Sequence, residues 1–382
     1  MTTATEHHET VIVGGGQAGL ATAYHLQRRG HDCVILDAGE RVGHAWRRRW
    51  PSLRLYSPAH LDGLPGMPFP GPARACPTAG EMADHLEAYA ERYSLPIRLG
   101  VRVDRVERGG DGYLVVAGDD AIRADNVVVA TGVMLESCPR IPGFAADLDP
   151  RVTQLHSADY HDPGQLVPGR VLVVGASHSG SDIAYELARA GFSTTLSGRD
   201  TGELPVRLDG RLVRTLAPLV RLVLTRVISD STPIGRKARG EIRHHGGPFI
   251  RIRAGDLADA GVERVFERTV GVEGGKPVLA GGRVLDIENV VWCTGFGRDD
   301  AWLRFPVPLD DDGYPQQERG VATSVPGLYF VGMLFLHSFS SMLVLGAGRD
   351  GERVAKHIVA RCAAADGRRA REVRRSKEEV AA

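Results

Sequence analysis

Three glycines at Gly14-x-Gly16-x-x-Gly19 follow the apolar run Val11–Val13 and precede a stretch with helical spacing of apolar residues that ends at Arg29. A second apolar run, Cys33–Leu36, comes next and ends in Asp37. This order predicts a strand, a glycine turn, a helix and a second, parallel strand. In such a unit the first glycine permits a tight turn and the second lets the backbone approach a pyrophosphate. The third lets the helix pack closely on the strand.

The predicted helix begins directly after the glycine turn, so the N–H groups around Gln17 and Ala18 are available to a bound phosphate. Asp37, with Ala38 beside it, stands at the separation expected for an acid that binds a ribose. The alternative is a glycine turn without a nucleotide, which the complete strand-helix-strand context disfavours. We therefore predict a dinucleotide site formed by Gly14, Gly16, Gln17, Ala18, Gly19, Asp37 and Ala38.

The same order returns later in the chain. The run Val171–Val174 leads into the turn Gly175-Ala-Ser177-His178-Ser179-Gly180, a helical stretch to Ala190 and a strand over Ser193–Ser197. Ser177 stands where the first unit has its middle glycine, so the approach of a pyrophosphate is more crowded there. We predict a second dinucleotide site formed by Gly175, Ser177, His178, Ser179 and Gly180.

The end of the second unit's last strand bears on which cofactor binds. The sequence there is Ser197-Gly-Arg199, with no carboxylate where an NAD-selective site would place one. An acid would repel a 2′-phosphate, whereas the Ser197 hydroxyl and the Arg199 guanidinium can bind one, so NADPH is favoured over NADH. The alternative is that Arg199 is only a solvated loop residue. Two nucleotide sites in one chain imply that one cofactor donates hydride and the other accepts it.

The rest of the chain supplies the domain organisation. A length of 382 residues suits two or three domains. Residues 101–123 predict a small antiparallel insertion, and residues 126–132 predict a buried strand that ends in a Thr-Gly turn. The similar runs at 290–295 and 328–332 indicate a return to the first domain. We predict an α/β fold with two Rossmann-like, three-layer ββα dinucleotide-binding domains, the second inserted into the first: 1–165 with 291–382, and 166–290, the latter carrying a helical excursion at about 203–248.

Composition excludes several classes of protein. The formal net charge of +0 gives no long-range attraction to nucleic acid. The five cysteines are scattered and include no Cys-x-x-Cys pair, so a disulfide scaffold, a zinc site and a dithiol that reduces disulfides are all disfavoured, and no metal site is expected. Residues 1–10 lack the pattern of a signal peptide, and the apolar stretch at 327–346 is interrupted by polar residues. We expect a cytoplasmic protein without a membrane partner; the oligomeric state stays open, with a homodimer among the options.

With these motifs in place, the chain resembles the flavin-containing monooxygenase superfamily, in particular small bacterial flavoproteins similar to cation-efflux-linked oxidoreductases. The resemblance covers nearly the whole chain. Besides the two glycine loops it includes Arg41-Val-Gly43-His-Ala-Trp46, Ser52–Pro58, Ala130-Thr131-Gly132, Cys293-Thr294-Gly295-Phe296, Gly327–Gly332 and Gly346–Asp350.

The resemblance implies FAD in the first unit and NADPH in the second. It implies that Gly43 and Trp46 border FAD and that Val103 touches the adenine edge. Trp46 as a core aromatic, Val103 as simple sheet packing and Ser341 as a helix cap are the structural alternatives. The further residues that the resemblance assigns to the cofactors or to the domain hinge are Ala130, Thr131, Gly132, Thr294, Gly295, Gly332, Ser341 and Met342.

The resemblance also implies a mechanism. NADPH reduces FAD, NADP⁺ stays bound, and dioxygen adds to the flavin as a C4a-(hydro)peroxyflavin, which oxygenates a small organic substrate. The linker has His156 followed by Tyr160 where Baeyer–Villiger enzymes place Trp, which favours N- or S-oxygenation. Shielding from water would be the main task of the protein, so few catalytic side chains are needed.

Catalytic residues are not identified by the sequence. Ser57, His178 and His337 are candidates near the flavin, each with a structural alternative: a turn cap, a phosphate contact and a core histidine, respectively. Two other functions stay open. One is an NADPH oxidase or flavin reductase that transfers no oxygen, and the other is a nucleotide-sensing regulatory subunit of a cation transporter.

Overall fold

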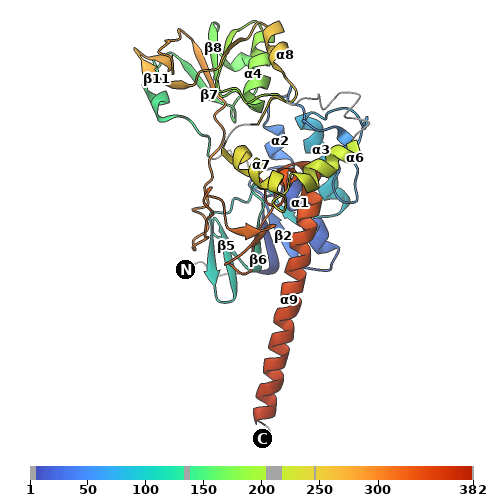
Figure 1. Cartoon of the computed structure of the whole chain (residues 1–382). Coiled ribbons are helices and arrows are strands. Elements are labelled where there is room, and N and C mark those ends of the chain that lie inside the picture. Colours follow the sequence, from blue (N-terminus) through green and yellow to red (C-terminus); the bar gives the residue numbers. More distant parts are fainter. Residues whose placement is uncertain (1–5, 133–137, 204–216, 245–246, 381–382) are drawn as a thin grey trace.

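The computed structural model describes residues 6–132, 138–203, 217–244 and 247–380. Two largely parallel sheets, each with a helix that follows a glycine turn, form two units (Figure 1). The second unit lies between two parts of the first along the chain. This confirms the predicted fold class of two Rossmann-like units, the second inserted into the first.

The first sheet is built around β1 (Glu6–Val13), whose β-branched residues Val11–Val13 are buried. β1 pairs in parallel with β2 on one side and with β6 on the other. The strand order is β14 (Gln317–Glu318), β15 (Val321–Ala322), β16 (Leu328–Phe330), β6 (Asp120–Val129), β1, β2 (Cys33–Leu36) and β3 (Ile97–Arg98).

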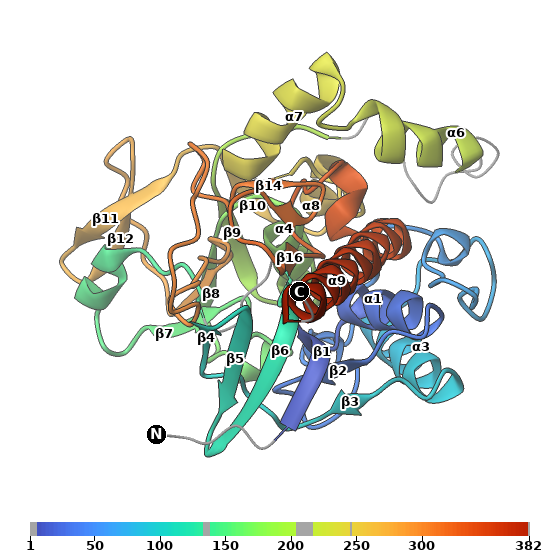
Figure 2. The same cartoon turned by 90° about the horizontal axis from the view of Figure 1, so that it is seen from below.

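Alternate residues of the first sheet face two different cores, as the two-residue period of a strand requires. On one face Ile12 and Ile35 pack against α1 (Gln17–Gln27), α3 (Ala79–Arg92) and α9 (Val344–Val380), and α1 and α9 lie side by side (Figure 2). On the other face Val11 and Val34 pack against the hairpin of β4 (Arg105–Gly109) and β5 (Gly112–Ala117) and against residues 303–336.

The hairpin of β4 and β5 is the predicted antiparallel insertion. β5 pairs with residues 120–124 of β6, and β6 then continues without a break to Val129. The sequence pattern suggests two strands here, but one long strand serves both the hairpin and the parallel sheet. Arg123 and Asp125 interrupt the apolar run of the sequence, but the strand continues through both residues.

The second sheet has the order β10 (Glu263–Val265), β9 (Ser193–Ser197), β8 (Arg170–Val174), β13 (Asn289–Trp292) and β7 (Thr153–His156), with every neighbouring pair parallel. α4 (His178–Arg189) and α8 (Ala254–Asp259) cover one face, where Ile183 and Leu257 pack on Val173. The other face is covered by η2 (Gly143–Asp147) and by the antiparallel pair β11 (Thr269–Glu273) and β12 (Lys276–Leu279).

The strand pairing corrects the predicted domain boundaries. β7 lies before residue 166 and β13 spans residue 291, yet both belong to the second sheet, because β13 pairs with β7 and β8. The run at 290–295 is therefore the last strand of the second unit, and the chain returns to the first unit only after it. A buried parallel strand followed by Thr-Gly has the same pattern in either sheet, so the sequence cannot assign it.

The excursion is helical where it is described, with α6 (Ala217–Leu222), a π-helical turn η4 (Val223–Val227) and α7 (Pro233–His244). Residues 204–216 and 245–246 of the predicted range lie outside the described residues. The helices α6 and α7 of the excursion lie beside the first unit, as Figure 1 shows, whereas Gly247 near its end contacts Ser177 of the second unit. Arg243 of α7 forms ion pairs with Asp310 and Asp312, and Ser229 forms a bridge with Ser338.

The remaining short elements lie in connections. They are α2 (His44–Arg47), η1 (Ala59–Leu61), η3 (Pro163–Gln165) and η5 (Phe339–Met342). Among the helices of the described residues, none has both the length and the apolar composition needed to cross a bilayer.

Candidate active site

The first glycine loop connects β1 to α1. Gly14 has a φ of +111°, and a Cβ there would lie 2.6 Å from the carbonyl oxygen of Ala130 at the end of β6. A Cβ at Gly19 would overlap the carbonyl oxygen of Gly14, whereas a Cβ at Gly16 would meet open space. No side chain caps the first turn of α1. Close packing at the first and third glycines, with an open second glycine and uncapped N–H groups, fits a bound pyrophosphate.

Asp37 lies at the end of β2 beside this loop. Its Oδ2 accepts the N–H of Gly15 at 2.5 Å, and its Oδ1 accepts the N–H of Gly39 at 2.7 Å. Each carboxylate oxygen can accept a further hydrogen bond, so ribose hydroxyls fit the same group. Ala38 follows it. The half-buried Val103 comes shortly after Val101, whose N–H donates to the Asp37 carbonyl at 2.9 Å.

Trp46 joins the segment after β2 to the first glycine loop. Its indole Nε1–H donates to Oε1 of Gln17, the first residue of α1, at 3.2 Å. Gly43 has a φ of +79°, and a Cβ there would lie 2.8 Å from the backbone of Ala83, so this glycine lets α2 approach α3. Trp46 therefore lies beside the first glycine loop, where it is predicted to border the cofactor. Gly43, in contrast, allows α2 to pack closely on α3.

The C-terminal segment returns to the same loop. A Cβ at Gly332 would lie 2.8 Å from the Cβ of Ala18. The buried Ser341 Oγ accepts the N–H groups of His337 at 3.1 Å and Ser338 at 3.3 Å, which matches the predicted capping alternative. Met342, which follows, is half-buried.

The second glycine loop repeats the architecture of the first. A Cβ at Gly175 would overlap the carbonyl oxygen of Cys293, and a Cβ at Gly180 would overlap that of Gly175. Ser177 does not cap α4, because its Oγ donates to the carbonyl of Gly247 at 2.9 Å. The first turn of α4, with Ser179 half-buried in it, is thus free of a side-chain cap, as in α1.

His178 opens α4. Burial lowers the pKa of its imidazole, and its Nε2 is buried without a hydrogen-bond partner among the described residues. A neutral imidazole at a helix N-terminus is consistent with the positive end of the helix dipole. Its unpartnered nitrogen suits a ligand polar group at this loop.

The two residues predicted to bind a 2′-phosphate, Ser197 and Arg199, differ in their exposure at the end of β9. Ser197 is buried, and its Oγ donates to the Glu267 carbonyl at 2.8 Å, so this hydroxyl already serves the fold. Arg199 is exposed. Arg264 donates to the carbonyl oxygens of Gly198 at 2.7 Å and Arg199 at 3.0 Å, which fixes the turn that carries the Arg199 side chain.

Tyr56 of the first unit contacts the second glycine loop. Its ring centroid lies 5.0 Å from that of His178, and its hydroxyl donates to Oδ2 of Asp182 in α4 at 3.3 Å. Arg251 Nη2 lies 3.1 Å from the same oxygen. Burial raises the pKa of Asp182, and the charge of Arg251 opposes that shift. The segment 46–62 therefore runs from the first glycine loop at Trp46 to the second at Tyr56.

Ser57 lies directly after Tyr56. Its Oγ donates to Oδ1 of Asp62 at 2.6 Å, and Asp62 is completely buried. Neither Asp62 nor Asp182 was predicted as a site residue, because both acquire their partners from loops or from another unit. No sequence periodicity marks such contacts.

The two chain crossings between the units run side by side. Arg140 N–H donates to the Gly295 carbonyl at 2.9 Å, and the Thr294 hydroxyl donates to the Arg140 carbonyl. His156 lies beside them, with its Nε2 3.1 Å from the Gly295 oxygen. Thr294 and Gly295 therefore lie in the connection between the two units, hydrogen-bonded to the other crossing. Thr131 and Gly132 follow the end of β6 in the first unit, and residues 133–137 lie outside the described residues.

His337 is held by the excursion. Its Nδ1 lies 3.1 Å from Oδ1 of Asp230. Burial alone would raise the pKa of Asp230, but the hydrogen bonds from His337 and Ser229 and the charges of His337 and Arg319 together lower it. Arg349 in α9 also donates to the Thr225 carbonyl of the excursion at 3.1 Å. His337 therefore links the excursion to η5.

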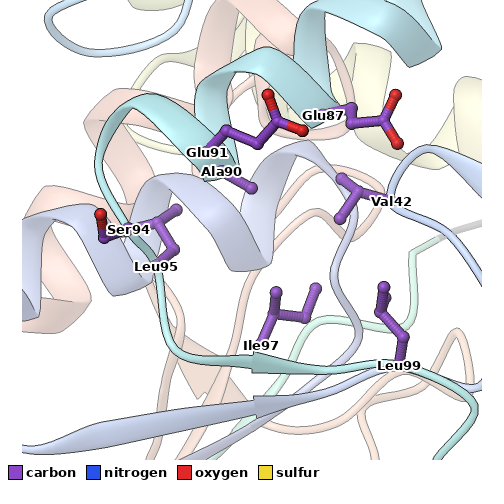
Figure 3. Close-up of a pocket in the computed structure, with 8 residues that line it drawn as sticks. All are labelled: Val42, Glu87, Ala90, Glu91, Ser94, Leu95, Ile97 and Leu99. Atoms are coloured by element: carbon purple, nitrogen blue, oxygen red, sulfur yellow. The ribbon is translucent and has the colours of Figure 1, made fainter.

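A cavity of about 300 Å³ lies between α3 and β3, behind the first glycine loop (Figure 3). One of its two lining glutamates, Glu87, pairs with Arg41 and Arg47. Its lining residue Ile97 lies against Gly15 of the first glycine loop, and its lining residue Val42 directly precedes Gly43, so the cavity borders the predicted dinucleotide site. In the described part of the chain, no group of three or more His, Cys, Asp or Glu side chains could hold a metal ion. The cavity is lined by Val42, Glu87, Ala90, Glu91, Ser94, Leu95, Ile97 and Leu99.

Comparisons with known proteins agree with this architecture. The family model for pyridine nucleotide-disulphide oxidoreductases matches residues 11–246. An uncharacterized CzcO-like oxidoreductase of Geobacillus kaustophilus (strain HTA426) is 33% identical over 92% of this chain and 98% of that protein. The probable indole-3-pyruvate monooxygenase YUCCA3 of Arabidopsis thaliana is 28% identical over 92% of this chain and 86% of that protein.

Among solved structures, a flavin-containing monooxygenase from Stenotrophomonas maltophilia is 27% identical, with a TM-score of 0.75. The match covers 94% of this chain and 100% of that chain. The likeness extends over both glycine loops and the segment that joins them. The chain therefore belongs to the flavin-containing monooxygenase and pyridine nucleotide-disulphide oxidoreductase family and is a flavin-dependent oxidoreductase/monooxygenase of that family.

Proposed function

We propose that the chain is an NADPH-dependent FAD monooxygenase that uses dioxygen to oxygenate a small organic substrate at nitrogen or sulfur. The observation that carries the proposal is the segment 46–62, which contacts the first glycine loop through Trp46 and the second through Tyr56. Two dinucleotides held at these loops would meet along this segment. Hydride transfer requires such a meeting of the two cofactors.

FAD is assigned to the first loop. Three separate segments surround that loop: Trp46, Ala130 at the end of β6, and Gly332 in the C-terminal return. Such enclosure suits a resident cofactor. Bound FAD supplies a hydride acceptor whose reduced form reacts with dioxygen. The residues of the chain would hold it and keep water away from its reactive ring.

NADPH is assigned to the second loop because of the exposed Arg199 and the lack of a carboxylate at the end of β9. His178, with its unpartnered Nε2, would contact the same cofactor. The engaged Ser197 hydroxyl leaves Arg199 as the main 2′-phosphate ligand. Ser177 and Gly175 would lie along the pyrophosphate.

The family description includes the reduction of disulfides. The spacing of the cysteines in this chain argues against that activity. The five cysteines are far apart in the sequence, whereas disulfide reduction through a dithiol needs two neighbouring thiols. N- or S-oxygenation is preferred over ketone insertion because Tyr160 stands where Baeyer–Villiger enzymes have Trp. Tyr160 is buried and donates to Glu186 at 2.8 Å.

The test uses the FAD-loaded protein. After anaerobic reduction by NADPH it is mixed with dioxygen, with and without NADP⁺, and flavin absorbance is followed by stopped flow. A species that is spectrally distinct from both oxidised and reduced flavin, and that NADP⁺ prolongs, supports a monooxygenase. Direct return to oxidised flavin with stoichiometric peroxide supports an oxidase, and negligible NADPH oxidation supports a regulatory subunit. A tertiary amine, a thioether and a cyclic ketone then separate the oxygenation types by product formed per NADPH.

A further inference from the structure

Asp62 is a buried carboxyl without a counter-charge. Its side chain is completely buried, Ser57 Oγ donates to its Oδ1 at 2.6 Å, and its Oδ2 has no hydrogen-bond partner among the described residues. Burial raises the pKa of Asp62 to about 7, and the hydrogen bond from Ser57 opposes the shift. No charged side chain of the described residues acts on this pKa. A buried carboxyl in this setting exchanges its proton near neutral pH.

Ser57 and Asp62 lie in the segment that connects the two glycine loops, which is where a proton could serve the reaction. Ser57 follows Tyr56, whose ring contacts His178 in the second glycine loop. On the other side of Asp62, Pro65 Cγ lies 2.7 Å from where a Cβ of Gly348 would stand, so the chain reaches α9 just after η5. Ser57 and Asp62 therefore lie in the stretch of chain between Tyr56, which contacts the second glycine loop, and Pro65, which packs beside Gly348 of α9.

Oxygen transfer to an amine or thioether consumes one proton per turnover. The substrate, dioxygen, NADPH and one proton give the oxygenated substrate, NADP⁺ and water. A site that excludes water cannot take this proton freely from solvent. A neutral carboxyl within the site can supply it and be recharged afterwards.

We propose that Asp62, acting through Ser57, holds and delivers a proton where the two nucleotide sites meet. When the carboxyl is neutral, its O–H donates to Ser57 Oγ, and the Ser57 hydroxyl hydrogen turns toward an acceptor on the opposite side. As the acceptor takes the Ser57 proton, Ser57 takes the carboxyl proton and Asp62 is left as a carboxylate. After the product leaves, solvent reaches the half-buried Ser57 again and returns the proton to Asp62 by the same route in reverse, and no electrons move in this relay. Asp62 is a positioning residue in this scheme, which rests on the proposed monooxygenase function.

The first test measures the flavin without turnover. The midpoint potential of bound FAD is titrated from about pH 5.5 to 8.5 for the unaltered protein and for Asp62→Asn, Ser57→Ala and Asp104→Asn. Asp104 is an exposed carboxylate that accepts the N–H of Gly118 and serves as the control. We expect the slope of potential against pH to change near pH 7 in the unaltered protein and in the control. Because N1 of reduced flavin also ionises near neutral pH, Asp62→Asn should reduce that change to the part that comes from the flavin itself, and Ser57→Ala should move the Asp62 part to higher pH because the opposing hydrogen bond is lost.

The second test measures product formed per NADPH with a thioether substrate. Asp62→Asn and Ser57→Ala should each lower this ratio on the order of 100-fold, the scale of a general acid, with peroxide released in place of product. The control should match the unaltered protein.

The outcomes separate this proposal from the one on which it rests. An inflection that is the same in Asp62→Asn as in the unaltered protein overturns the role of Asp62. If Asp62→Asn does not fold, an unchanged inflection in Ser57→Ala overturns it instead. A protein that binds FAD but releases only peroxide with every substrate refutes oxygen transfer. The potentials then still decide whether Asp62 exchanges a proton beside the flavin.

Discussion

The hydroxyl of Tyr56 in the first unit donates a hydrogen bond to Asp182 in α4 of the second unit, at 3.3 Å. Asp182 is buried and also pairs with Arg251 at 3.1 Å. Burial raises the pKa of Tyr56 well above its ordinary value, so the phenol stays protonated and remains a donor. This contact holds the segment between the glycine loops against the helix that follows the second loop.

Tyr56→Phe removes only the hydroxyl that joins the two units. We expect about 1 kcal/mol lower stability, the size of one hydrogen bond, and hydride transfer from NADPH to FAD slowed about 10-fold, because the two cofactors are held less closely in register. Anaerobic stopped flow at saturating NADPH measures that rate. Tyr93→Phe is the matched control, since the Tyr93 hydroxyl donates to the Gly66 carbonyl within the first unit. Equal rates in both variants would show that the contact between the units does not align the cofactors.

Arg199→Ala tests the NADPH assignment. Loss of a charge-assisted contact to the 2′-phosphate should raise the KM for NADPH roughly 10- to 100-fold, the range that corresponds to about 1.5–3 kcal/mol. The KM for NADH should stay unchanged because NADH lacks that phosphate. Arg189→Ala, at the exposed far end of α4, is the control. A parallel rise for both nucleotides would mean that Arg199 acts on the fold and not on the phosphate.

Sequence patterns predict local geometry well here, because each glycine loop is a contiguous unit with a fixed spacing. Gly14, Gly19, Gly175 and Gly180 stand where a Cβ would collide with backbone. Patterns fail where partners come from distant segments. The buried run of β13 has the same pattern in either sheet, and only its pairing with β8 assigns it. The Ser197 hydroxyl is predicted to bind a 2′-phosphate, yet it is buried and donates to the carbonyl of Glu267. The partners of Asp62 and Asp182 are likewise set by loop packing.

Two substitutions in the first loop separate binding from folding. Gly16→Val places its side chain in open space, so we expect unfolding of the apoprotein to change by no more than about 0.5 kcal/mol while FAD affinity is lost. Gly19→Ala forces a Cβ into the Gly14 carbonyl and should cost about 1–3 kcal/mol. Denaturant titration of the apoprotein and quenching of FAD fluorescence measure the two effects. Retained FAD affinity in Gly16→Val would exclude this loop as the flavin site.

Arg243 anchors the excursion to the first unit. Its side chain is 3% exposed, pairs with Asp310 at 2.8 Å and with Asp312 at 2.9 Å, and lies 4.0 Å from the ring centroid of Tyr314. Arg243→Ala leaves two carboxylates facing each other and should cost about 3 kcal/mol. Because α7 is held at this point, protease cleavage within the excursion should also accelerate. Lys237→Ala, on the exposed side of α7, should change neither; if both variants behave alike, the ion pairs at Asp310 and Asp312 do not anchor the helix.

Asp62 should give the folded protein a distinctive pH dependence. Its pKa is about 7 in the folded chain, against an ordinary value of about 4 when unfolded, so the folded state binds more protons between these values. The free energy of unfolding should therefore fall as pH rises from about 4 to 7, by roughly 4 kcal/mol from this group, and then level off. Denaturant titrations of Asp62→Asn should lack this component. The free energy of unfolding of the variant should therefore rise relative to that of the unaltered protein as pH rises. Parallel curves for the two proteins across this range would mean that the Asp62 carboxyl ionises as if it were solvated.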